Sequence, residues 1–159
     1  MSEASKLQKI EKFRRYMLTE TEGLTTEQVN TIPAGFGNNI AWNLGHVMAS
    51  ALMLFYKRAG HSVPVDEQYI QPFLPGTKPE ENYSAERIAT IRALAGRTLQ
   101  TMLQDLDRLD FSSYTKSENI ERVYGIALLT IEDALDFLLY HEGYHLGKIR
   151  TIKQLIETK

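Results

Sequence analysis

The stretch FLLYHEGYHLGKI, residues 137–149, places two histidines inside an apolar helical run. His141 and His145 are four residues apart, so a helix brings both imidazoles to one face, one turn apart. A third histidine, His46, lies in NNIAWNLGHVMASALMLFYKRAG, residues 38–60, again among apolar residues. Three neutral imidazoles are good ligands for zinc, nickel or copper and leave coordination positions open. The pattern therefore predicts an open metal site where these two helical runs meet.

Four long helical segments are predicted from the period of the apolar residues. They cover residues 2–22, 38–60, 84–109 and 130 to the C-terminus. Asn38 or Asn39 is a suitable N-cap for the second segment, and Ser84 and Thr130 are suitable for the third and fourth. A short helical segment is expected to begin at Thr25 or Thr26 and to stop before Pro33.

Two long connections complete the chain. Residues 61–83 hold four of the five prolines, and residues 110–129 are expected to form an irregular turn or a short strand. No long strand alternation is present, so the sequence predicts an all-α four-helix bundle in a single domain, 1–159. The first connection is long for a hairpin and can cross the bundle, which would make the second and third helices parallel.

The charge and composition exclude several classes of protein. A net charge of −2 argues against a general nucleic-acid binder, which would present a basic face. The chain has no cysteine, hence no Cys-ligated zinc and no cysteine nucleophile. No secretory signal or membrane span is visible. We expect a cytoplasmic protein with no membrane and no nucleic acid as partner.

The simplest alternative is that these histidines are ordinary buried residues that make hydrogen bonds in the core. Two histidines on one core face and a third on another favour a metal, because unpaired polar groups in a core are costly. On a helical wheel Glu142 also leans inward, and Asn43 is placed to hold a ligand imidazole through its second nitrogen. His61 lies in the proline-rich connection and is expected to be exposed and outside the site.

Other residues near these segments have structural interpretations. Trp42 lies one turn before His46 and is expected to be a core or interface aromatic, or the wall of a pocket. A basic cluster on the first helix is expected to be a solvated face. Four apolar residues are expected to line either a dimer seam or a pocket. The basic cluster is Lys12, Arg14 and Arg15, and the apolar residues are Phe55, Tyr56, Phe73 and Leu74.

The segment HEGYH also matches the short HExxH pattern of zinc proteases, in which the Glu activates a water molecule. That interpretation makes Glu142 a candidate catalytic residue. Such proteases also need a sheet beside the helix and usually a third ligand downstream. No histidine, and among acids only Glu157, follows His145. A zinc hydrolase is therefore the third hypothesis.

Two segments resemble the DinB-like superfamily: WNLGHV around His46 and HEGYHLGKI around His141 and His145. PAGFGNNIAWNLGH and YGIALLTIEDALDFLLYHEGYHLGKI extend the resemblance over nearly the whole chain. It implies an up-down-down-up four-helix bundle with a long crossover between helices two and three, often as a homodimer. It also implies a divalent metal, usually zinc or nickel, on His46, His141 and His145. Relatives often have Gln at the position of Lys148.

Characterised members of that superfamily include metal-dependent thiol transferases and a mycothiol-dependent maleylpyruvate isomerase. The resemblance therefore implies a metal-dependent transferase that moves a low-molecular-weight thiol onto an electrophile. Metal coordination would lower the pKa of the thiol. The alternative is a non-catalytic bundle that binds a metal or small ligand and dimerises. A metal position open to a pocket would favour the enzyme, and a sealed site would favour the binding module.

Overall fold

The computed structural model describes residues 1–157, and these residues form helices and loops with no strand. The α-helices are α1 (Glu3–Glu20), α2 (Thr26–Asn30), α3 (Ile40–Phe55), α4 (Ala85–Asp105), α5 (Glu118–Tyr124) and α6 (Ile131–Glu157). Three short 3-10 helices, η1 (Lys57–Ala59), η2 (Glu67–Tyr69) and η3 (Gln71–Phe73), lie between α3 and α4. The prediction of an all-helical fold is confirmed. Residues 158–159, which the fourth predicted helix included, lie outside the described residues.

Side-chain caps begin the long helices where the sequence predicted them. Asn39 Oδ1 accepts a hydrogen bond from the Trp42 amide at 2.8 Å, and Ser84 Oγ accepts one from the Arg87 amide at 3.1 Å. At the start of α6, Thr130 and Asp133 cap each other's backbone amides reciprocally. α3 ends at Phe55, earlier than predicted, because the chain continues as the 3-10 helix η1. Gly60 ends η1 in the left-handed conformation, at φ 80.

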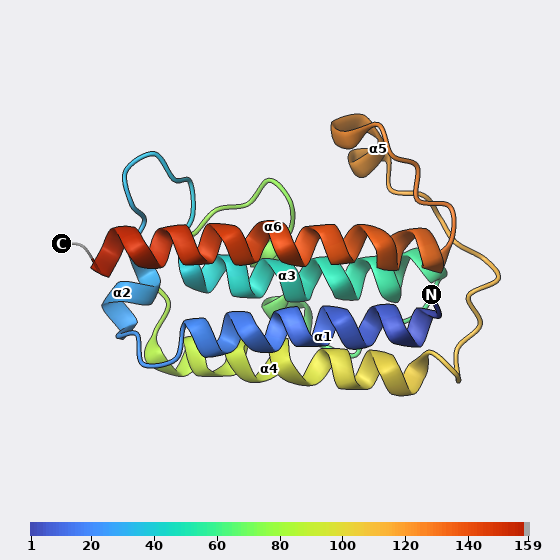
Figure 1. The fold of residues 1–159 in the computed structure, drawn as a ribbon, viewed down its shortest axis with the longest axis horizontal. Helices are drawn as coiled ribbons and strands as arrows, with labels where there is room; N and C mark the ends of the chain where they lie inside the picture. Colours follow the sequence, from blue (N-terminus) through green and yellow to red (C-terminus); the bar gives the residue numbers. More distant parts are fainter. Residues whose placement is uncertain (158–159) are drawn as a thin grey trace.

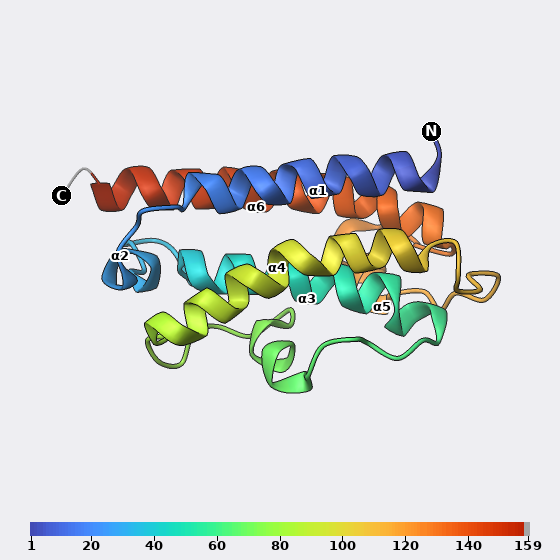
Figure 2. The same cartoon turned by 90° about the horizontal axis from the view of Figure 1, so that it is seen from below.

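The four long helices lie side by side, with α1 and α6 in one layer and α3 and α4 in the other (Figure 1, Figure 2). Each long helix contacts its neighbour in its own layer and one helix of the other layer, through the pairs α1–α6, α1–α4, α3–α4 and α3–α6. The colours in Figure 1 show α1 and α6 running toward one end and α3 and α4 running back. The connection from α3 to α4 therefore returns along the outside of α3 (Figure 2).

α3 is the most deeply placed of the long helices. All of its residues except Met53 are buried, which fits a helix that is apolar around most of its circumference. Phe55, Tyr56 and Phe73 are also fully buried in the same core, so they do not form a dimer seam. Of the two predicted roles, the dimer seam is therefore wrong for these three aromatics, whereas Leu74 is only partly buried. Any functional group on α3 is consequently internal.

The second connection differs from its prediction. Residues 110–129 contain helix α5 rather than a strand, and Gly125 ends that helix at φ 68. α5 projects away from the four long helices (Figure 1). Among the described residues, no helix is both long and apolar enough to cross a membrane.

Candidate metal centre

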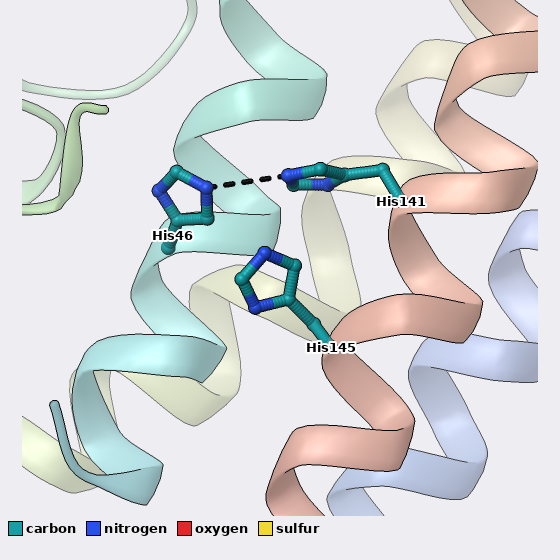
Figure 3. Close-up of side chains that lie close together, drawn as sticks. All are labelled: His46, His141 and His145. Atoms are coloured by element: carbon teal, nitrogen blue, oxygen red, sulfur yellow. Dashed lines mark hydrogen bonds between the residues drawn. The ribbon is translucent and has the colours of Figure 1, made fainter. Parts of the chain in front are cut away.

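The structure brings together the three histidines that the sequence singled out. His46 on α3 faces His141 and His145 on α6, and one nitrogen from each ring lies within 4.8 Å of the others (Figure 3). His141 Nε2 and His46 Nε2 are 3.2 Å apart. All three side chains are buried, between 4% and 7% exposed. They form a three-nitrogen cluster able to hold a metal ion.

His46 is held on two sides. Its Nδ1–H donates a hydrogen bond to the carbonyl oxygen of Phe73 at 2.7 Å, which leaves Nε2 free of a proton. The Trp42 ring stacks on the imidazole with centroids 4.5 Å apart and an angle of 11° between the planes. Trp42 Nε1 donates in turn to Thr77 Oγ1 at 3.1 Å. The ring orientation of His46 is therefore fixed by α3 and by the connection that follows it.

His145 is oriented by Asn43, one turn before His46 on α3. The ring Nδ1–H donates to Asn43 Oδ1 at 2.7 Å. The amide nitrogen of Asn43 donates to the Asn39 carbonyl at 2.7 Å and to Asn38 Oδ1 at 3.0 Å, so its oxygen is the atom that faces the imidazole. Asn43 takes the position expected from the sequence, and His145 Nε2 is left unprotonated.

His141 differs from the other two rings. Its Nδ1 is buried and has no hydrogen-bond partner among residues 1–157, although nearly all buried polar atoms have one. Phe137, one turn earlier on α6, packs against the ring with centroids 5.8 Å apart. The two facing Nε2 atoms of His141 and His46 are unfavourable as bare lone pairs and need a proton or a cation between them.

Burial holds the three imidazoles neutral. Desolvation lowers the pKa of His141 to about 3, with smaller effects from His46 and Arg14. Desolvation also lowers the pKa of His145 and of His46, and the positive charge of Lys148 lowers both further. The Phe73 carbonyl opposes part of the effect on His46. Neutral imidazole is the form that binds metals, so the cluster is ready for a cation at ordinary pH.

These features fit a divalent cation. Two nitrogens on one zinc ion at ~2.1 Å lie about 3.0–3.4 Å apart for angles near 90–110°, which includes the 3.2 Å separation of His46 and His141. A carbonyl or amide oxygen on the second ring nitrogen is the usual support of a metal-bound histidine. His46 and His145 both have one, and the arrangement fits the ligand set expected from the sequence.

Glu142 lies inward, as the helical wheel predicted, and is fully buried. Its two carboxylate oxygens accept hydrogen bonds from Arg14 on α1, from Nε at 2.9 Å and from Nη2. Arg14 also donates to the carbonyl oxygens of Val47 at 2.9 Å and Ala95 at 3.2 Å. The prediction of a solvated face is therefore wrong for Arg14, whose guanidinium ties α1 to the other three long helices. Burial raises the pKa of Glu142, and the Arg14 charge opposes that effect.

Other residues occupy the surroundings of the cluster. His61 lies apart from it, as expected, and donates from Nε2 to the Asp110 carbonyl at 2.8 Å, but it is half-buried rather than exposed. Tyr140 and Tyr144 are exposed beside the pair on α6, and the Lys148 ammonium lies 5.1 Å from the Tyr144 ring centroid. Sequence reasoning missed the Phe73 carbonyl, because a backbone acceptor from a distant loop leaves no residue-type signal.

Comparison with known proteins identifies a family for this chain. Among curated proteins, no sequence match is found. A family model described as the DinB superfamily matches residues 9–149, a range that includes all three clustered histidines. The matched range covers most of α1 and α6 and everything between them. The chain belongs to the DinB superfamily.

Proposed function

We propose that the chain is a single domain, 1–159, with an up-down-down-up four-helix bundle that holds one divalent cation on His46, His141 and His145. Imidazole ligands suit zinc, nickel and copper, and the resemblance to the family favours zinc or nickel among them. The observation that carries the proposal is the convergence of three buried neutral rings. Two of these have their Nδ1–H taken by an oxygen, and the Nε2 atoms of His46 and His141 are 3.2 Å apart.

The resemblance to characterised DinB-like proteins suggests the activity that we propose for this site, the transfer of a low-molecular-weight thiol onto a small electrophile. When bound, the metal lowers the pKa of a coordinated thiol and supplies a thiolate at neutral pH. The chain's own residues orient the site: Phe73 and Asn43 fix the rings of His46 and His145, and Trp42 excludes water from one side of His46. A cytoplasmic homodimer is part of the same proposal, and the dimer rests on the resemblance to the family.

A non-catalytic metal-binding bundle is the second candidate. The low exposure of the three rings favours it, because an enzyme must admit a substrate to the open metal positions. The zinc hydrolase is disfavoured on two grounds. The carboxylate of Glu142 is engaged by Arg14, and the described part of the chain has no strand beside α6.

Metal analysis of untagged protein tests the proposed ligands. We expect one divalent ion per chain in the wild type and near-complete loss in His46→Ala, His141→Ala and His145→Ala. His61→Ala is the matched control, since that histidine lies outside the cluster and should leave the metal content unchanged. Metal retained at full content in any of the three cluster variants would contradict the ligand set.

Activity separates the two candidate functions. Metal-loaded wild type is mixed with a small thiol and a reactive electrophile, and disappearance of the free thiol is followed. A transferase consumes thiol faster than the uncatalysed reaction and loses this effect in His46→Ala. A panel of thiols and electrophiles with no acceleration, together with full metal content, would support the binding module.

A further inference from the structure

Gly45 stands immediately before His46 on α3 and faces the ring of Phe73 in η3. A Cβ atom built on Gly45 would lie 2.4 Å from Phe73 Cδ1 and 2.6 Å from both Cε1 and Cγ. Real Cβ atoms essentially never come closer than 3.0 Å to such neighbours. The Phe73 ring is fully buried and is part of the core, so it has no free space into which to turn. The Phe73 ring can therefore pack this closely on α3 only because residue 45 is a glycine.

The same residue, Phe73, also supplies the carbonyl that holds His46. Its oxygen accepts the Nδ1–H of His46 at 2.7 Å. Phe73 thus touches two successive residues of α3, with its ring on Gly45 and its backbone oxygen on His46. Because the buried ring has no room to rotate, relief of a clash with it requires the Phe73 backbone to shift, and the carbonyl moves with that backbone.

Hydrogen bonds within the connection hold the backbone on both sides of Phe73. The Phe73 amide donates to the Ile70 carbonyl at 3.0 Å, which closes the turn. Further on, Thr77 Oγ1 lies 2.7 Å from the Pro72 carbonyl oxygen and 2.8 Å from that of Leu74, and it donates its single proton to one of them. The same oxygen accepts a hydrogen bond from Trp42 Nε1. Trp42 is the residue that stacks on His46. Residues 71–77 therefore contact His46 through the carbonyl and support its other side through Trp42.

We propose that Gly45 is a positioning residue of the three-histidine site. By leaving room for the Phe73 ring, it lets the connection pack on α3 and places the Phe73 carbonyl within hydrogen-bond distance of His46 Nδ1. That hydrogen bond selects the Nδ1–H tautomer and presents an unprotonated Nε2 to His141 and His145. The metal consequence rests on the proposed function, whereas the tautomer consequence does not require a metal.

Substituting Gly45 separates this role from helix stability. Alanine is a better helix former than glycine, so Gly45→Ala favours α3 intrinsically and harms only what packs against it. Displacement of Phe73 leaves His46 Nδ1 without its acceptor, and the ring then populates both tautomers. Loss of such a supporting contact lowers metal affinity by about 10–100-fold.

Gly143→Ala is the matched control. Gly143 lies on α6 between His141 and His145, and a Cβ there meets no atom within 4 Å. Both substitutions add one methyl group to a helical glycine near the site, yet only Gly45→Ala collides with a neighbour. Circular dichroism checks that both variants remain helical.

The test uses two readouts on the full chain. Long-range ¹H–¹⁵N spectra of the metal-free protein report the tautomer of each histidine, and competition with a chelator gives the affinity for Zn²⁺. We expect a single Nδ1–H tautomer for His46 in wild type and Gly143→Ala, and mixed tautomers with 10–100-fold weaker zinc binding in Gly45→Ala. A helical Gly45→Ala with the wild-type tautomer and an affinity within twofold would overturn the proposal.

Phe73→Ala keeps the proposal testable if Gly45→Ala does not fold. This variant removes the ring and retains the glycine, so we expect mixed His46 tautomers here too. Adding Gly45→Ala to Phe73→Ala should then change the tautomer ratio and the zinc affinity little further, because the two residues act through one contact. Wild-type tautomers in Phe73→Ala would refute the role of the docked ring. Wild type that fails to bind zinc would reject the metal site, and the metal-free spectra would still decide the role of Gly45.

Discussion

Glu142→Gln perturbs the buried ion pair beneath the histidines while it preserves the shape of the side chain. Arg14 and Glu142 are 1% and 0% exposed, so neither charge has water to compensate it. The substitution removes the negative charge and turns one acceptor oxygen into an amide group that faces the guanidinium donors. Arg14 keeps the carbonyls of Val47 and Ala95 but loses its counter-charge.

Breaking a buried pair by removing one partner costs about 3–5 kcal/mol. A domain is stabilised by only about 5–15 kcal/mol in total, so this is a large fraction of the free energy of unfolding. In a chain of this size each kcal/mol shifts the melting temperature by about 2–4 °C, which gives a decrease of roughly 6–20 °C. Arg14→Met combined with Glu142→Met should recover much of the loss, because no unpaired charge remains.

Urea denaturation of metal-free protein measures this cost. Glu11→Gln serves as the control, since Glu11 pairs with the exposed Arg15 and should change the stability by less than about 1 kcal/mol. Where Glu142→Gln remains folded, we expect it to retain the metal and to show no peptidase activity. A cost as small as that of Glu11→Gln would refute the charged pair. Loss of metal from folded Glu142→Gln would mean that the carboxylate is part of the metal site.

Three further predictions concern the whole chain. Zinc at about 100 times its dissociation constant should stabilise the fold by about 2.7 kcal/mol, seen as a higher melting temperature that a chelator reverses; no change would argue against binding. The unfolded chain protonates His141 near pKa 6.5 and the folded chain only near 3, so between these values the unfolded state binds more protons and acid favours unfolding. In urea titrations of metal-free protein, His141 should therefore lower the free energy of unfolding by ~2 kcal/mol between pH 7 and pH 5. His141→Phe should show a smaller decrease over the same range. Light scattering at micromolar concentration should give twice the chain mass, and a monomer would contradict the proposed dimer.

The parts of the fold that depend on local chemistry could be predicted from the sequence. Asn39, Ser84 and Thr130 cap their helices as expected, because a cap needs only its own side chain and the next turn of backbone. The His141–His145 pair was predictable for a similar reason, since spacing alone puts both on one face, whereas the expectation that His46 joins them depended also on the family motif. Helix α5 was missed because a seven-residue segment carries too little period to separate a helix from a turn.

Contacts that depend on the relative placement of segments could not be predicted. The Phe73 carbonyl on His46 requires the connection to return along α3, and neither the turn nor its docking point is encoded within one segment. Gly45 gave a weaker signal that could have been used, because a glycine inside an apolar helix often marks a close approach of another element. It could not identify which element approaches.

Arg14 lies between these two cases. Leu7, Ile10 and Met17 are fully buried, and the spacing of 7, 10, 14 and 17 places position 14 on the same helical stripe. Phe13, the apolar neighbour, is 39% exposed, so residue type was a worse guide than period. A charge on the core stripe of α1 and a carboxylate on the core stripe of α6 each need a partner, and each is the other's obvious candidate. The missing information is the stagger of two adjacent helices, which decides whether residues 128 positions apart meet at one level.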